Sequence, residues 1–155
     1  MTLPEITLRR LETQLDVVSI LLAGARPEQI EARPAPETWS ARENLAHLAR
    51  HHRVFLERIG RILAEETPDL GRYRAEDDPE WPEWKALPLE EILARLDESR
   101  RKILAVALEL NEEKAARRGR HPVLGAMPLS RWFEFFLLHE AHHLYVVMLR
   151  LGPAA

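Results

Sequence analysis

Apolar residues recur every three or four positions in four long stretches of this chain, which is the spacing that places them on one face of an α-helix. The pattern predicts long amphipathic helices over residues 4–23, about 40–65, 88–112 and 128–151. No stretch alternates apolar and polar residues as a half-buried strand would, and no internal repeat is visible. The chain is therefore expected to be all-α.

The segments between these helices differ in length. Residues 25–38 are proline-rich and predict a connector with at most one short turn. Residues 66–87 are acidic, contain Pro68, Pro79 and Pro82, and predict a long crossover, while residues 113–127 predict a basic loop. Four long helices with one long crossover indicate a four-helix bundle, and we expect one domain over residues 1–155.

Composition narrows the class of protein further. The 155 residues carry a net charge of −3, so the chain has no excess of positive charge with which to bind nucleic acid. The chain has no cysteine, which excludes disulfides, thiolate nucleophiles and iron–sulfur clusters. It shows neither a signal-peptide pattern at residues 1–5 nor an apolar run long enough for a membrane, so we expect a cytoplasmic protein.

The most apolar stretch of the chain also holds histidines. His139 and His143 lie one turn apart in the predicted helix 128–151, on the stripe that contains Phe136. Two imidazoles on an apolar face would repel each other if charged, and they would be costly to bury without partners. A metal ion removes that cost because neutral imidazole is a good ligand for zinc, nickel, iron or copper. A pair of hydrogen-bonded histidines is the alternative.

A third ligand could come from the predicted helix 40–65, which contains His47, His51 and His52. His47 and His51 are again one turn apart, with His51 nearer the centre of the apolar face and His47 toward its edge. Spacing alone does not choose between them. For His52 a solvated or hydrogen-bonded side chain is the favoured interpretation.

Two motifs resemble those of the DinB/YfiT-like metal-binding bundles. They are Trp39-Ser40-x-x-Glu43-x-x-x-His47-Leu48 and His139-x-x-x-His143, and the likeness extends over nearly the whole chain. The resemblance implies a divalent metal held by His47, His139 and His143, and pairing of the bundle as a homodimer. His51 and His142 would then be extra groups that support the ligands or contact the substrate.

A divalent metal held by three neutral histidines would support two classes of reaction, and the resemblance places the first of them slightly ahead. The first is transfer of a low-molecular-weight thiol such as bacillithiol or mycothiol to a small-molecule substrate, with the metal holding the thiolate. The second is metal-dependent hydrolysis, which needs a general base, and Glu43 and Glu140 are candidates for it. A capping box with Ser40 is the simpler role for Glu43, and an ordinary polar-face position is the simpler role for Glu140.

Further expectations concern the metal and the surroundings of the site. Zinc or nickel is expected first, with iron or manganese as alternatives. An anionic cosubstrate could meet basic side chains of the loop, and aromatic side chains could line a pocket or belong to the core. The residues concerned are Arg117, Arg118 and Arg120 for the anion and Trp81, Trp84 and Trp132 for the pocket.

The three ligands come from only two helices, so they can occupy one side of the ion. We expect its open side to face the region between the crossover 66–87 and the loop 113–127. A non-enzymatic protein, with a structural metal or a stress-related interaction role, is the remaining alternative. A protein group that closes the fourth position would indicate it.

Overall fold

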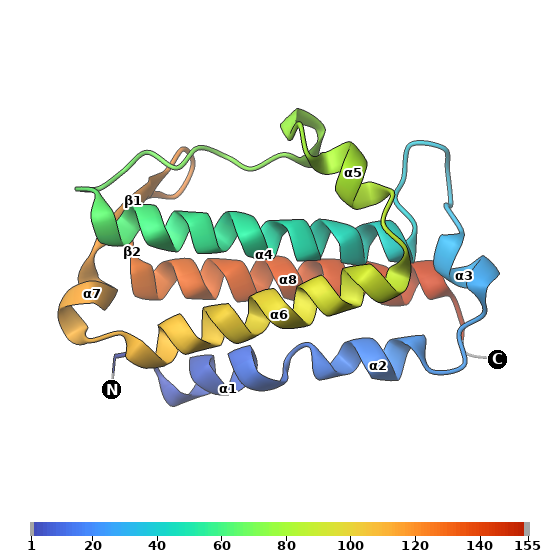
Figure 1. Cartoon of the computed structure of the whole chain (residues 1–155), viewed down its shortest axis with the longest axis horizontal. Helices are drawn as coiled ribbons and strands as arrows, with labels where there is room; N and C mark the ends of the chain where they lie inside the picture. The colour runs from blue at the N-terminus through green and yellow to red at the C-terminus, as the bar shows by residue number, and fades with distance from the viewer. Residues whose placement is uncertain (1, 154–155) are drawn as a thin grey trace.

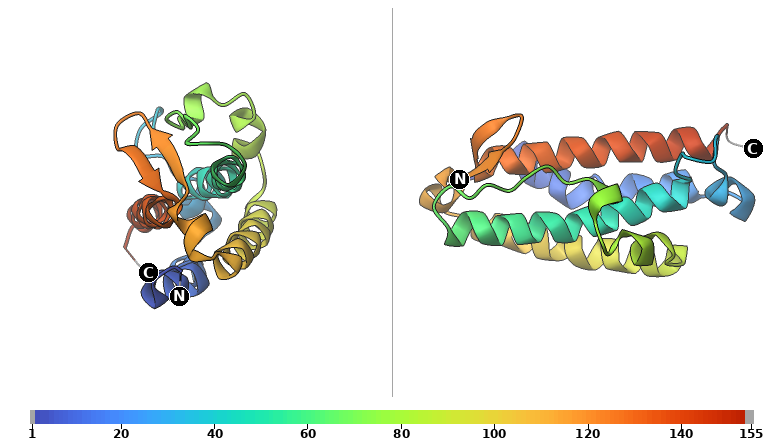
Figure 2. Two further views of the ribbon diagram at one scale, coloured as in Figure 1. Left: turned by 90° about the vertical axis from the view of Figure 1, so that its left-hand side faces the viewer. Right: turned by 90° about the horizontal axis from the view of Figure 1, so that it is seen from above.

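The computed structural model describes residues 2–153, which form four long helical legs that run side by side (Figures 1 and 2). The predicted four-helix bundle is confirmed. Helix α4 packs against both α6 and α8, and the N-terminal leg lies against α6 and α8. The legs are α1 (Glu5–Thr13) with α2 (Asp16–Leu22), α4 (Ala41–Ala64), α6 (Leu89–Glu109) and α8 (Leu129–Leu151).

The first leg is broken, although apolar spacing predicted one helix over residues 4–23. Helix α1 ends at Thr13, and α2 begins at Asp16. Gln14, at the break, donates hydrogen bonds to the Leu137 carbonyl and to Glu140 of α8. These tertiary bonds stabilise the break, which periodicity along a single helix could not reveal.

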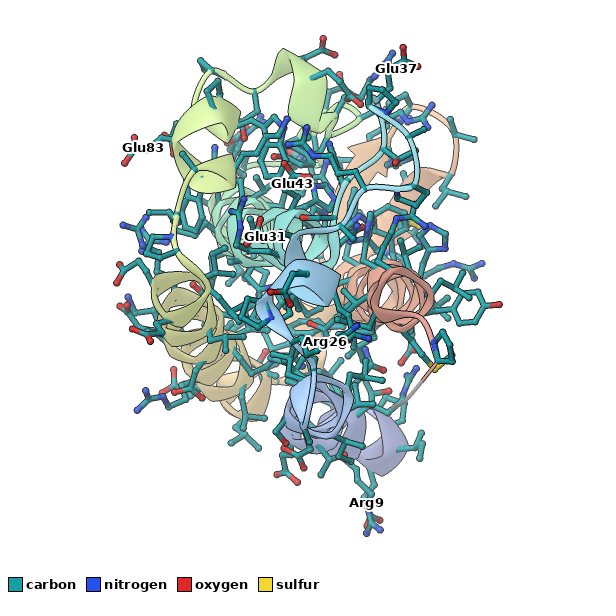
Figure 3. All side chains as sticks on the ribbon, turned by 90° about the vertical axis from the view of Figure 1, so that its right-hand side faces the viewer. Arg9, Arg26, Glu31, Glu37, Glu43 and Glu83 are labelled. Carbon is teal, nitrogen blue, oxygen red and sulfur yellow. The ribbon has the colours of Figure 1, made fainter. Side chains whose placement is uncertain are left out.

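The start of α4 is set by its own sequence. The Ser40 side chain accepts a hydrogen bond from the Glu43 amide, and the Glu43 carboxylate accepts one from the Ser40 amide. This reciprocal capping box satisfies two amides that a helix start leaves open. Glu43 also pairs with Arg33, in the connector after the short helix α3 (Pro27–Glu31). Glu43 is buried, and in Figure 3 it lies near the middle of the view, whereas Glu37 and Glu83 lie at the edge.

The predicted basic loop is a helix followed by a hairpin, so the prediction that the chain has no strand is wrong. The short helix α7 (Glu112–Ala116) leads into β1 (Arg118–His121), which pairs antiparallel with β2 (Gly125–Pro128). Four-residue strands are too short for alternation to be recognised, and tertiary contacts stabilise this pair.

The crossover from α4 to α6 contains a 3₁₀ turn, η1 (Ala75–Asp77), and a short helix, α5 (Trp81–Lys85). It runs over α4 toward α5 and begins beside the hairpin (Figure 1). Arg120 of β1 exchanges backbone hydrogen bonds with Pro68 and Leu70 of the crossover. A Cβ at Gly119 would lie 2.7 Å from the Leu70 side chain, so this approach requires glycine. The crossover and the hairpin therefore form one connected surface.

The apolar core has two parts along the bundle, separated by a layer of polar side chains, of which three are buried and Gln14 is half-buried. One part is centred on Phe55, Ile103 and Phe136, and the other on Leu48, Leu96 and Leu144. Each of the four legs contributes one residue to the polar layer between these two parts. This polar layer consists of Gln14, His52, Arg100 and Glu140.

In the described residues, no helix is both long enough and apolar enough to cross a lipid bilayer.

Candidate metal centre

His47 of α4 and His139 and His143 of α8 lie together, as the resemblance implied. The Nε2 atoms of His47 and His139 are 3.1 Å apart, and one nitrogen from each histidine lies within 4.8 Å of the others. Two nitrogens bound to one zinc ion at tetrahedral angles would lie about 3.3 Å apart. The spacing therefore fits a single ion. We call His47, His139 and His143 the histidine site.

Burial favours the neutral, metal-binding form of all three imidazoles. Burial, and then the nearby His143, lower the pKa of His47 to about 3 and that of His139 to about 2. Burial and then His142 lower the pKa of His143 to about 4. Near neutral pH the three rings thus carry lone pairs rather than charges, which is what a divalent metal requires.

Asn44 orients one member of the histidine site. Its Nδ2 donates to the Ser40 carbonyl at 2.9 Å, which leaves its Oδ1 to accept a hydrogen bond from His143 Nδ1 at 2.9 Å. His143 is thereby held as the tautomer whose Nε2 has a free lone pair. Such outer hydrogen bonds fix the ligand ring and raise its basicity. Asn44 lies one turn before His47, so helical spacing could have identified it.

The histidine site opens onto a cavity of about 730 Å³. Its walls come from α4, α8, the crossover and the hairpin, which is the region that the open side of the ion was expected to face. The ring of Trp39 lies 4.9 Å from that of His47 at one end of this cavity. The lining side chains are Trp39, His47, His51, Arg58, Arg72, Tyr73, Arg74, Ala75, Glu76, His121, Val123, Leu124, Phe135, His139 and His143.

The other histidines have separate surroundings. His51 is buried and lines the cavity, with its ring centroid 3.9 Å from that of His139. Burial, and then His139, lower its pKa well below the usual value. His52 is fully buried in the polar layer, with Nδ1 2.6 Å from the Leu48 carbonyl oxygen. His142 is exposed and does not line the cavity.

Neither predicted general base faces the cavity. Glu43 is held by the capping box and by Arg33, and these contacts lower its pKa against the effect of burial. Glu140 is not the polar-face residue that spacing suggested, because it is fully buried in the polar layer. Burial alone would raise the pKa of Glu140, but His52 and Arg100 lower it to about 2. Both carboxylates therefore stabilise the fold.

The arginines proposed for an anion and the tryptophans proposed for a pocket also have structural roles. Arg117 donates to the Ile62 and Glu65 carbonyls near the end of α4. The Arg118 side chain bonds to the Ala126 carbonyl, and that of Arg120 pairs with Asp69. The three tryptophans are buried in the core, namely Trp81, Trp84 and Trp132.

Other side chains of the cavity were not singled out from the sequence. They include Arg58, Arg72, Tyr73, Arg74 and His121. Arg58 could have been found by spacing, because it follows His51 by seven residues and so shares its face of α4. The crossover and hairpin residues could not, since only tertiary packing brings those segments to α4.

The model of the DinB superfamily matches residues 10–147, which is most of the chain. The protein belongs to the DinB superfamily. Among solved structures, YfiT from Bacillus subtilis has a TM-score of 0.79 at 20% identity, over 96% of this chain and 85% of YfiT. Its structure is described as that of a probable metal-dependent hydrolase with an unusual four-helix bundle topology. The DinB-like protein YjoA from the same organism has a TM-score of 0.59 at 17% identity, over 97% of this chain and 95% of YjoA.

Two curated proteins are also similar to this chain. "Putative metal-dependent hydrolase OB0782" of Oceanobacillus iheyensis is 25% identical over 119 residues, 76% of this chain and 67% of the relative. The uncharacterised protein YuaE of Bacillus subtilis is 27% identical over 135 residues, 79% of this chain and 83% of YuaE. The family and the four-helix bundle predicted from the sequence are thus both confirmed.

Proposed function

We propose that this DinB protein is a metal-dependent enzyme whose histidine site holds one divalent metal, zinc or nickel first, facing a small-molecule substrate in the cavity. The observation that carries the proposal is the convergence of three neutral imidazoles on the wall of a cavity of about 730 Å³. A structural metal would be enclosed by four protein ligands. In the described part of the chain, the group of possible ligands comprises three residues and borders open space.

A metal bound at this site would supply positive charge that lowers the pKa of a coordinated water or thiol. The chain's own residues would set the geometry. His47, His139 and His143 would present their lone pairs from one side, and Asn44 would keep His143 in the binding tautomer. Trp39 and Tyr73 would limit access of water to the ligands, since both rings lie against His47.

We favour thiol transfer as the reaction class. Hydrolysis is helped by a general base, but both predicted bases are held in ion pairs away from the cavity. The acidic side chain among the described cavity residues is Glu76, which is exposed and near Arg74. A metal-held thiol requires no separate base. Hydrolysis is the second candidate, and the names of OB0782 and YfiT favour it.

Metal analysis tests the histidine site. Protein purified without chelator or affinity tag should contain one divalent metal per chain, and His47→Ala, His139→Ala and His143→Ala should each lose it. His142→Ala and His51→Ala are the controls and should retain the metal. Equal metal content in all six proteins would remove the proposal.

A cobalt-substituted protein separates the two reaction classes. A thiolate binds a borderline metal strongly and changes its visible absorption, so a low-molecular-weight thiol should perturb the cobalt spectrum if transfer is the reaction. A spectrum that no tested thiol perturbs would make hydrolysis the leading candidate. The homodimer and the cytoplasmic location remain predictions.

A further inference from the structure

Two arginines of the described chain are buried, and only one of them has a carboxylate partner. Arg100 pairs with Glu140 in the polar layer. Arg58 is 5% exposed, donates to the Gly71 carbonyl at 3.2 Å, and packs over the Trp132 ring. No acidic side chain within residues 2–153 forms an ion pair with it. Burying a charge without a partner is costly, so this position calls for an explanation.

Arg58 lines the same cavity as the histidine site. It lies two helical turns after His51, or roughly 10 Å along α4. Burial lowers the pKa of its guanidinium to about 10, so the group is still a cation at neutral pH. Its other N–H groups find no acceptor among the described residues, which leaves them available to a ligand.

The surroundings of Arg58 strengthen its positive character. Arg72 and Arg74 of the crossover line the cavity and are exposed, and Glu76 is the one acid among the lining residues that the structure describes. The Nδ1 of His121 accepts hydrogen bonds from the Val123 and Leu124 amides. A neutral His121 therefore carries its proton on Nε2, as a further donor. The end of the cavity away from Trp39 thus presents donors and cations.

We propose that Arg58, assisted by Arg72, binds an anionic group of the substrate, a carboxylate or a phosphate, while the reacting group of that substrate lies at the histidine site. The second half of this statement rests on the proposed function, whereas binding of the anion by Arg58 needs no metal. A guanidinium presents a planar fork of donors that matches both anions. The anionic partner is thus assigned to the body of the bundle, not to Arg117, Arg118 and Arg120 of the predicted loop.

Anion binding by the metal-free protein tests this inference. Inorganic phosphate and succinate are titrated separately, with calorimetry and intrinsic tryptophan fluorescence as readouts. We expect the wild type to bind one of the two more tightly, which identifies the anion as a phosphate or a carboxylate. Arg58→Met should weaken that binding at least about 10-fold, because hydrogen bonds to charged groups are lost.

Arg53→Met is the matched control, since Arg53 is an exposed arginine of the same helix and lies over the Trp84 ring, away from Arg58. It should change the affinity less than about 2-fold, because it does not line the cavity. If Arg58→Met does not fold, the exposed Arg72→Met replaces it and should also weaken binding. The inference is overturned if the wild type binds neither anion, or if the cavity variant and the Arg53 variant behave alike.

Metal loading of the same variants separates this inference from the proposed function. Arg58→Met should take up as much zinc as the wild type, because no ligand has been changed. A wild type that binds the anion but no metal would overturn the proposed function and leave the anion site standing. A wild type that binds metal but neither anion would overturn the anion site and leave the proposed function standing.

Discussion

Helices α4 and α8 contribute to two polar clusters that lie close together and differ in how their charges are compensated and in what they border. In the polar layer, the charges of Arg100 and Glu140 compensate each other, Gln14 donates to Glu140, and His52 Nε2 lies 3.0 Å from Glu140 Oε2. Arg100 Nε has no hydrogen-bond partner in the described chain, but its charge has one. At the histidine site, the imidazoles of His47 and His139 have buried Nδ1 atoms without a partner in the described chain. The first cluster is enclosed by the bundle, and the second borders a cavity.

The comparison shows that burial of polar groups does not by itself indicate a site. A buried cluster whose charges are compensated within the chain and which the bundle encloses has a structural explanation, because it fixes the register of the legs. A cluster whose lone pairs converge on a cavity, beside an uncompensated cation such as Arg58, indicates a partner from outside the chain. Their responses to pH and to mutation should therefore differ.

The largest expected difference is in pH dependence. The pKa values of His47, His139, His143 and His51 are lowered on folding, so the unfolded chain binds more protons below about pH 6.5. The cost of keeping these rings neutral is absent above that pH, and it grows as the pH falls to about 4 for His143, about 3 for His47 and about 2 for His139. Each ring contributes a slope of up to about 1.4 kcal/mol per pH unit. Urea unfolding of metal-free protein between pH 7 and pH 5 measures the total.

Glu140 should not contribute to that slope. Its pKa is lowered to about 2, so its stabilising effect is present above about pH 4.5 and disappears as the pH falls toward 2. His51→Phe is the control for the histidines. It removes one buried imidazole at a position already stacked on Phe136, and it should flatten the slope above pH 5. A stability independent of pH from 7 to 5 would contradict the prediction.

Glu140→Gln should have the next largest effect. It removes the charge that compensates Arg100 and leaves a buried cation, which costs about 3–5 kcal/mol of unfolding free energy. Chemical denaturation measures this loss, and metal content should stay at the wild-type level. Loss of metal without loss of stability would instead place Glu140 in the function of the histidine site.

Asn44→Ala should have the smallest effect of the three. The variant keeps all three ligands but releases His143 Nδ1, so metal affinity should fall about 10–100-fold. Competition with a chromophoric chelator measures the affinity. Asn44→Asp keeps an acceptor for His143 Nδ1 and should retain most of the binding. Equal losses in the two variants would mean that the hydrogen bond does not support the ligand.

The sequence alone determined the elements whose causes are local. Apolar spacing and the Ser40–Glu43 capping box predicted four helical legs and the beginning of α4, because these depend on residues three or four positions apart. The spacing of His139 and His143 indicated a metal site for the same reason. The resemblance of the motifs then supplied His47, which spacing could not distinguish from His51.

Only the tertiary structure decided what depends on distant segments. The break at Gln14 is stabilised by α8, and the hairpin is stabilised by the crossover and α4. The role of Glu140 reversed from candidate base to structural anion because α6 places Arg100 beside it. The cavity exists because the crossover and the hairpin meet above α4 and α8. The spacing of apolar residues shows which face of a helix is apolar. It does not show the partner of a buried charge, because that partner comes from another part of the chain.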